Sequence, residues 1–196
     1  FESNFSGMFG MSQFENNWIL TGELNLQMEN YFQNAEKGEF FWKRIDSLSQ
    51  TIKMGIMLPH PFGWRSGVDL NYQHEIFRGL YASVESRYVF NTYSPLLGTT
   101  GFGYVTGKTS PTSKGKENGY EKTSYNGFSL FSRKENINDR YLPTSGSMFK
   151  LSADGGLDGK TGFVNSGLQL FKIVSLNRNI FYKIKYNAQG IFYRGT

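Results

Sequence analysis

Apolar and polar residues alternate with a period of two along most of this chain. Residues 17–29 are the clearest stretch, because every second position from Trp18 to Met28 is apolar or Gly and alternates with Thr21, Glu23, Asn25 and Gln27. Residues 65–76 and 79–91 alternate in the same way around a tight turn at 77–79, which predicts a hairpin. Successive side chains of a strand point to opposite faces. The pattern therefore predicts an all-β fold.

About nine strands of roughly 10–16 residues are expected, within a range of about 8–10. Their ranges are 3–12, 17–29, 39–58, 65–76, 79–91, 123–134, 146–156, 162–174 and 179–194. The range 39–58 is either one long strand or two strands hinged near Asp46 and Ser47, and we favour one strand. Residues 92–122, rich in Gly, Ser, Thr and Lys, are predicted to form a long extracellular loop, which includes the Gly-rich run 101–109.

Strand length decides between a soluble sheet and a membrane barrel. Strands of soluble proteins usually have about 5–6 residues, and these are about twice as long. Aromatic residues lie near the expected strand ends, as in the interfacial girdles of membrane barrels. They are Tyr72, Phe77, Tyr81, Tyr88, Phe90, Tyr125, Tyr182, Phe192 and Tyr193. The sequence predicts a transmembrane antiparallel β-barrel over residues 1–196 as a single domain. The alternative is a soluble β-sandwich or a β-rich repeat with one solvated face.

The polar face carries charges of both signs, which a dry core would not tolerate but a wet lumen would. We expect these side chains to face the lumen: Glu23, Asp69, Glu85, Arg87, Lys150, Asp154, Lys183 and Lys185. Lys183 and Lys185 are the most prominent pair. We expect them to pair with carboxylates such as Asp154 or Glu85, and a role in ion selectivity is the alternative.

Candidate chemistry is sparse. The chain has no Cys and two His, His60 and His74, without metal-ligand or catalytic spacing. We therefore expect no enzyme activity, no cofactor and no metal. The net charge of +5 comes from scattered basic residues, which favours an anionic membrane surface over nucleic acid.

The run from Arg133 to Gly156 resembles the barrels of the BamA-like family of outer-membrane assembly factors and bacterial surface antigens. The resemblance is carried by a turn that contains Asp139, Arg140, Pro143, Thr144 and Gly146, followed by an alternating strand. The hairpin within 63–88 is similar to the barrels of patatin-like autotransporters, a branch of the same superfamily. In all, the resemblance covers roughly residues 49–194.

The resemblance implies a bacterial outer-membrane protein that assists insertion of proteins into, or translocation across, that membrane. It also implies as partners the lipid bilayer, with lipopolysaccharide, and unfolded barrel or passenger clients, and it leaves a homo-oligomer open. The alternative is a passive barrel, acting as a pore or as the anchor of a secreted passenger. The chain departs from the family by having no periplasmic POTRA domain, no Val-Arg-Gly-Phe loop motif and fewer strands than the usual sixteen. We therefore expect a partial or reduced barrel.

Overall fold

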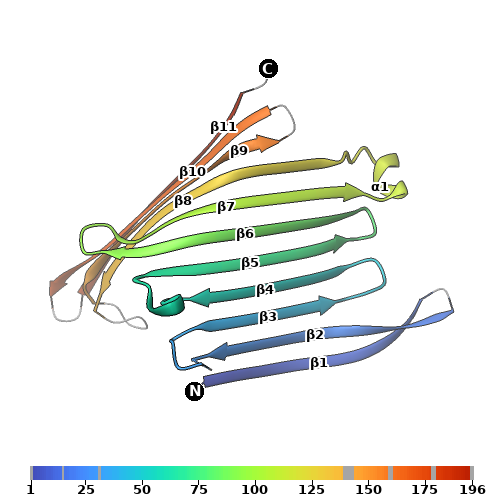
Figure 1. Ribbon diagram of the computed structural model, residues 1–196, viewed down its shortest axis with the longest axis horizontal. Coiled ribbons are helices and arrows are strands. Elements are labelled where there is room, and N and C mark those ends of the chain that lie inside the picture. The colour runs from blue at the N-terminus through green and yellow to red at the C-terminus, as the bar shows by residue number, and fades with distance from the viewer. Residues whose placement is uncertain are drawn as a thin grey trace. The chain divides into compact units, whose positions relative to one another are not determined.

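The computed structural model describes residues 2–14, 16–30, 32–138, 144–158, 161–177 and 180–194. Within them the chain forms one antiparallel sheet whose hydrogen-bonded neighbours follow the order of the sequence (Figure 1). The strands are β1 (Glu2–Phe14), β2 (Asn17–Glu29), β3 (Lys37–Arg44), β4 (Gln50–Leu58), β5 (Ser66–Phe77), β6 (Tyr81–Ser94), β7 (Gly98–Pro111), β8 (Thr123–Ile137), β9 (Gly146–Asp158), β10 (Thr161–Asn177) and β11 (Ile180–Arg194). A 3-10 turn, η1 (Pro61–Gly63), and a short helix, α1 (Ser113–Glu117), complete the elements.

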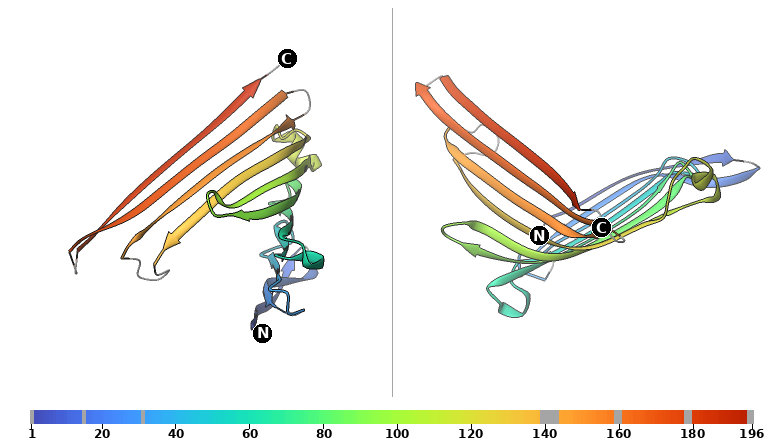
Figure 2. Two further views of the ribbon diagram at one scale, coloured as in Figure 1. Left: turned by 60° about the vertical axis from the view of Figure 1, so that its left-hand side comes forward. Right: turned by 90° about the horizontal axis from the view of Figure 1, so that it is seen from above.

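The chain divides into two compact units. The first comprises Phe1–Phe90 and Tyr104–Asn126, and the second comprises Asn91–Gly103 and Gly127–Thr196. In the first unit β1 to β5 lie side by side in both Figure 1 and Figure 2. In the second unit β9, β10 and β11 do the same, with β10 in the middle.

Neither face of the sheet forms a dry core. Among the described residues the buried apolar side chains are Val89, Val105 and Ile173, whereas large apolar residues such as Trp18 and Phe192 are about two-thirds exposed, at 66% and 68%. A soluble sandwich would bury its apolar rows between two sheets. The predicted all-β fold is confirmed, and the burial contradicts the sandwich alternative. No helix in the described part of the chain is long and apolar enough to span a bilayer.

The single strand favoured over residues 39–58 is wrong. The structure has two strands, β3 and β4, which pair with each other from Lys37 opposite Met57 to Arg44 opposite Gln50. The Asp46 carboxylate accepts a hydrogen bond from the backbone N–H of Leu48 at 2.7 Å, and so closes a local turn between the strands. The apolar residues on both sides of this turn continue the alternation, which hides the turn in the sequence.

The long loop predicted over residues 92–122 is also wrong. Strand β6 continues to Ser94, β7 occupies Gly98–Pro111, and the short helix α1 follows at Ser113–Glu117. With β7 added and the range 39–58 divided, the described residues form eleven strands rather than about nine. The 14-residue strand β7 is not evident in the sequence because its buried positions include Gly101 and Gly107, which have no side chain to mark the alternation.

The hairpin predicted from residues 65–91 is confirmed. Its turn holds Arg78 at φ 49° and Gly79 at φ 62°, and the second value suits a residue without Cβ. Helix α1 packs on this turn, because Thr112 donates its backbone N–H to the Leu80 carbonyl at 2.9 Å and its hydroxyl to Gly79 O at 2.6 Å. A Cβ on Gly115 would lie only 1.9 Å from Leu80 O. The contact is therefore made backbone to backbone.

The turn from β2 to β3 is organised by Glu36, which is buried among backbone groups. Its carboxylate accepts hydrogen bonds from the N–H groups of Phe32 and Asn34. Burial by itself would raise the pKa of the Glu36 carboxyl, but the hydrogen bonds from the backbone N–H groups of Phe32, Glu36 itself and Asn34 outweigh it, so the pKa is lower than usual. The ionised carboxylate therefore stabilises this turn.

Candidate functional site: the polar face of the sheet

In the first unit the pairing of β2, β3, β4 and β5 assembles one continuous polar face. Residues paired across an antiparallel ladder share a face. Four rows therefore cross the strands: Glu23–Lys43–Thr51–Glu75, Asn25–Phe41–Lys53–Gln73, Gln27–Glu39–Gly55–Asn71 and Glu29–Lys37–Met57–Asp69. The opposite face carries mainly apolar residues, such as Leu24, Trp42, Ile52 and Leu70. The alternation seen in the sequence is thus aligned from strand to strand.

Opposite charges meet within these rows. Lys43 lies 2.9 Å from Glu23, and Lys37 lies 2.7 Å from Glu29. All four side chains are about half exposed, so each pair contributes at most about 1 kcal/mol. Their effect is to balance charge on the face rather than to hold the fold together. Glu23, one of the side chains predicted to face the lumen, belongs to the first pair.

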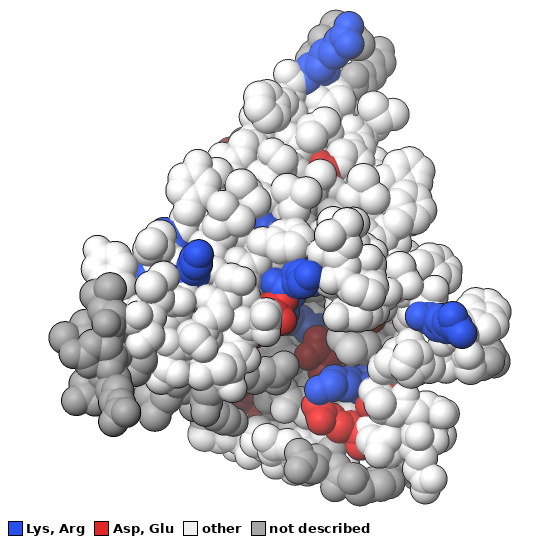
Figure 3. All heavy atoms as spheres, turned by 90° about the vertical axis from the view of Figure 1, so that its left-hand side faces the viewer, with Lys and Arg blue, Asp and Glu red and all other residues white. Residues whose placement is uncertain are grey.

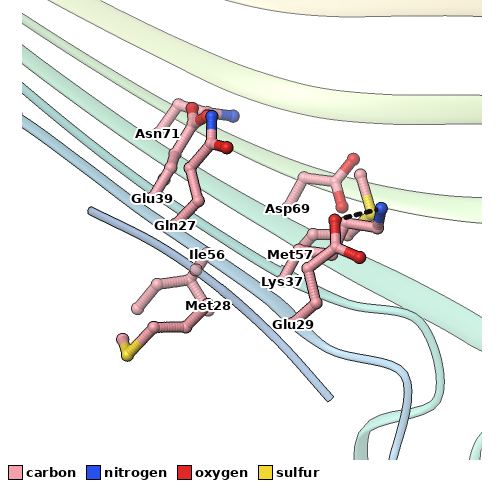
Figure 4. A pocket seen from close by; sticks show the side chains of 11 residues that line it. Gln27, Met28, Glu29, Lys37, Glu39, Ile56, Met57, Asp69 and Asn71 are labelled. Carbon is pink, nitrogen blue, oxygen red and sulfur yellow. Dashed lines mark hydrogen bonds and ion pairs between the residues drawn. The ribbon is translucent and has the colours of Figure 1, made fainter. Parts of the chain in front are cut away.

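A hollow of about 240 Å³ opens on this face near the ends of β2 and β3 (Figure 4). Glu29, Lys37 and Asp69 lie together on one side of the sheet in Figure 4, while Met28 and Ile56 point to the other side. Asp69, also predicted to face the lumen, lines the hollow. The described residues include no group of three or more His, Cys, Asp or Glu suited to a metal ion.

Gly55 makes room for the Glu39 side chain in that hollow. The two residues are cross-strand partners, and a Cβ on Gly55 would lie 2.6 Å from Glu39 Cγ and Oε1. The carboxylate of Glu39 therefore extends over Gly55 toward the next strand, where Asn71 is the partner of Gly55. Figure 4 shows Glu39 beside Gln27 and Asn71.

A hydrogen bond between side chains of β6 and β8 passes over β7, which lies between these two strands. The hydroxyl of Tyr125 in β8 donates to Glu85 in β6 at 2.5 Å. On the way its ring crosses Gly107 of β7, where a Cβ would lie 2.2 Å from Tyr125 Cε1. Arg87, two residues along β6, approaches Glu85 at 4.0 Å. The hydroxyl of Tyr125, one of the aromatic residues expected near strand ends, thus bonds a carboxylate of the same unit.

In the second unit, Lys150, Asp154, Lys183 and Lys185 share one face of β9 to β11. Lys150 lies opposite Gln169, and Asp154 lies opposite Asn165. The Lys183 ammonium lies 4.8 Å from the centroid of the Phe171 ring, which is a cation–π contact. Lys185 is the cross-strand partner of Phe171.

The expected pairing of Lys183 with Asp154 is wrong. Lys183 lies opposite Ile173 of β10, whereas Asp154 lies opposite Asn165 of the same strand. Eight residues separate these two positions, which is about 27 Å along a strand. Register, which the sequence does not specify, keeps the two charges apart. Glu85 lies in the first unit, where Tyr125 and Arg87 are its neighbours, and its pairing with Lys183 or Lys185 stays a prediction.

The turn that carries the family resemblance is partly described. Asp139, Arg140 and Pro143 lie outside the described residues. Asn138 accepts hydrogen bonds on Oδ1 from the backbone N–H groups of Thr144 and Ser145, and donates from Nδ2 to Thr144 Oγ1 at 2.7 Å. Gly146 follows at φ 128°, where a Cβ would lie 2.2 Å from Asn136 O. Asn138 therefore joins the two described sides of this turn, a role that is common for Asn but that the alternation along the chain does not indicate.

Charge on the face seen in Figure 3 is mixed rather than of one sign. Blue and red atoms lie against each other there, and the remaining basic atoms are separated by uncharged ones. Arg133 and Glu135, 2.5 Å apart, form another pair of this kind in the second unit. A nucleic-acid surface would instead gather positive charge.

Long antiparallel strands with an exposed apolar face and a charge-paired polar face are the features of a transmembrane β-barrel. The family model described as the Omp85 superfamily domain matches residues 5–195. The chain therefore belongs to the Omp85 superfamily, a β-barrel family of the outer membrane that acts in protein insertion and translocation. No curated protein matches the chain.

Proposed function

We propose that this chain assists the insertion of proteins into, or their translocation across, the bacterial outer membrane. The role is not enzymatic: the chain offers an incoming polypeptide a strand to pair with. Its partners are unfolded barrel or passenger clients and the bilayer, including lipopolysaccharide. Family membership supports this class of activity.

The observation that carries the mechanism is strand β1. It has one hydrogen-bonded neighbour, β2, within the described part of the chain. A strand with one unpaired side presents free N–H and C=O groups, which can template another strand by β-augmentation. Phe5 is 67% exposed and Met8 is 74% exposed, although they point to opposite faces. The apolar side chains on both faces would contact an incoming strand and the surrounding lipid.

Disulfide trapping tests this mechanism, because the chain has no native Cys. Ser6→Cys on β1 should form a disulfide with a cysteine in a folding client strand. Thr51→Cys on β4, which has β3 and β5 as neighbours, is the matched control and should not. Liposomes containing the folded protein should also accelerate folding of a client barrel. Equal trapping at both positions, or no acceleration by correctly folded protein, contradicts the proposal.

The second candidate is a passive barrel, a pore or an anchor. It is favoured by the polar rows of β2 to β5, which would suit a water-filled lumen. Single-channel conductance whose charge selectivity changes with Lys183→Glu would support the pore, whereas silent bilayers would oppose it.

A further inference from the structure

The apolar face of β9 to β11 carries one basic residue near each end. Lys172 of β10 lies on it between Ser147 and Ile184, and Arg194 of β11 lies on it opposite Gly162. The positions between them on this face are uncharged on all three strands, and include Leu151, Leu168 and Tyr186. This is the opposite of the polar face, where charges are frequent.

The spacing of these two cations matches the thickness of a membrane. Ten residues separate Gly162 from Lys172 along β10, which is about 34 Å at ~3.4 Å per residue. A strand tilt of about 40° reduces that to about 26 Å across the bilayer, close to the ~25 Å apolar band of outer-membrane barrels. Lys172 and Arg194 therefore lie at the level of the lipid headgroups.

A second lysine joins Lys172 at its end of the face. Lys134 of β8 and Lys172 both line a hollow of about 570 Å³, which is in the size range of ligand sites. Phe149, Leu170 and Tyr186 supply apolar and aromatic walls, and none of the described lining residues carries a carboxylate. The Lys134 ammonium donates to the carbonyls of Pro95 at 2.7 Å and Leu96 at 3.2 Å. These bonds fix its position and leave its third N–H for another acceptor.

We infer that this hollow binds an anionic phospholipid. The headgroup phosphate lies between the ammonium groups of Lys134 and Lys172, and an acyl chain lies along Phe149, Leu170 and Tyr186. Positive charge over an apolar wall, at headgroup depth and without a protein carboxylate, complements a lipid of this kind. A single lysine such as Lys172 could extend to the interface without preferring any lipid. Lys134 is held in place by the Pro95 and Leu96 carbonyls, so it adds a second positive charge at a fixed position. The inference rests on the membrane location of the chain and not on client insertion.

Native mass spectrometry can test this on the whole chain, released from micelles with equal amounts of phosphatidylglycerol and phosphatidylcholine. The wild type should retain phosphatidylglycerol preferentially. Lys172→Gln should lower the ratio of the two retained lipids about fivefold, and Lys134→Gln should lower it similarly. Lys172→Arg should preserve it. Lys183→Gln, which removes a lysine from the opposite face of the same unit, is the matched control and should leave it unchanged.

Three results would overturn the inference: a wild-type ratio near one, an equal loss in the Lys183→Gln control, or displacement of the lipid by inorganic phosphate alone. Heat-modifiable migration on a gel verifies that each variant is folded, and Lys134→Gln serves as an independent variant if Lys172→Gln does not fold. Client folding in phosphatidylcholine liposomes is measured separately, so a failed insertase assay is distinguishable from a failed lipid site.

Discussion

Gly107→Ala should destabilise the protein, although alanine is ordinarily better than glycine inside a strand. The new Cβ would lie 2.2 Å from Tyr125 Cε1 and 2.4 Å from Cζ, far inside contact distance. The Tyr125 ring must therefore move, and its hydroxyl then loses Glu85. Gly107 has no side chain and takes no direct part in the Tyr125–Glu85 hydrogen bond between β8 and β6. Its substitution acts on that bond only by displacing the Tyr125 ring.

The expected cost is about 1–1.5 kcal/mol. A hydrogen bond to a charged group contributes about 1.5–3 kcal/mol, but the Glu85 side chain is 46% exposed, so we take about 1 kcal/mol. Displaced ring contacts add about 1 kcal/mol. Replacing glycine by alanine within a strand by itself stabilises the folded state by about 0.5–1 kcal/mol, which offsets part of this cost. In a Tyr125→Ala background only that last contribution remains, so Gly107→Ala should there be stabilising.

Urea unfolding in detergent micelles, followed by tryptophan fluorescence, measures both effects. Gly38→Ala is the control, since its Cβ would meet Met28 Cε at an ordinary 3.6 Å, and it should be neutral or stabilising in either background. The reasoning is refuted if Gly107→Ala has the same sign with and without the Tyr125 ring.

Three further outcomes are expected. Because folding lowers the pKa of Glu36, its carboxylate adds to the free energy of unfolding above the ordinary pKa of 4.5, and this contribution is lost as the pH falls below that value. The wild type should therefore lose more stability between pH 7 and pH 3.5 than Glu36→Gln does, as measured by urea midpoints. Glu23→Lys should cost at most about 1 kcal/mol in unfolding free energy at low salt, and adding Lys43→Glu should restore it; no recovery would exclude a direct pair. Gly115→Ala should separate α1 from Leu80 and speed proteolysis within residues 112–122, and an unchanged cleavage rate would show that the contact is dispensable.

Strands whose alternate positions carry large side chains could be predicted from the sequence, whereas β7, with glycine at several of those positions, could not. The range 17–29 coincides with β2, because Trp18, Leu20 and Leu24 mark every second position. Strand β7 was missed because what fills the space at its glycines comes from another strand: a Cβ on Gly101 would lie 2.2 Å from the ring of Phe131 in β8. Such a contact between residues 30 positions apart leaves no local pattern.

The polar face could be predicted as a set of residues but not as a set of pairs. Alternation places Glu23 on it, but only the register of β2 against β3 brings Lys43 opposite. In the same way, alternation places Lys183 and Asp154 on one face, while the register separates them. A one-residue shift of register would move a side chain to the other face, so pairing depends on contacts along whole strands.

The two faces satisfy the same electrostatic requirement by different means. A cation at the edge of a low-dielectric region is stable only beside an anion, a polar group or an aromatic ring. On the polar face the protein supplies these partners, as Glu23 does for Lys43 and Phe171 does for Lys183. On the apolar face a carboxylate would itself have to be desolvated beside the acyl chains, which is costly. Lipid phosphates are already present at that depth, so a lysine such as Lys172 gains an anion there without any protein carboxylate being buried.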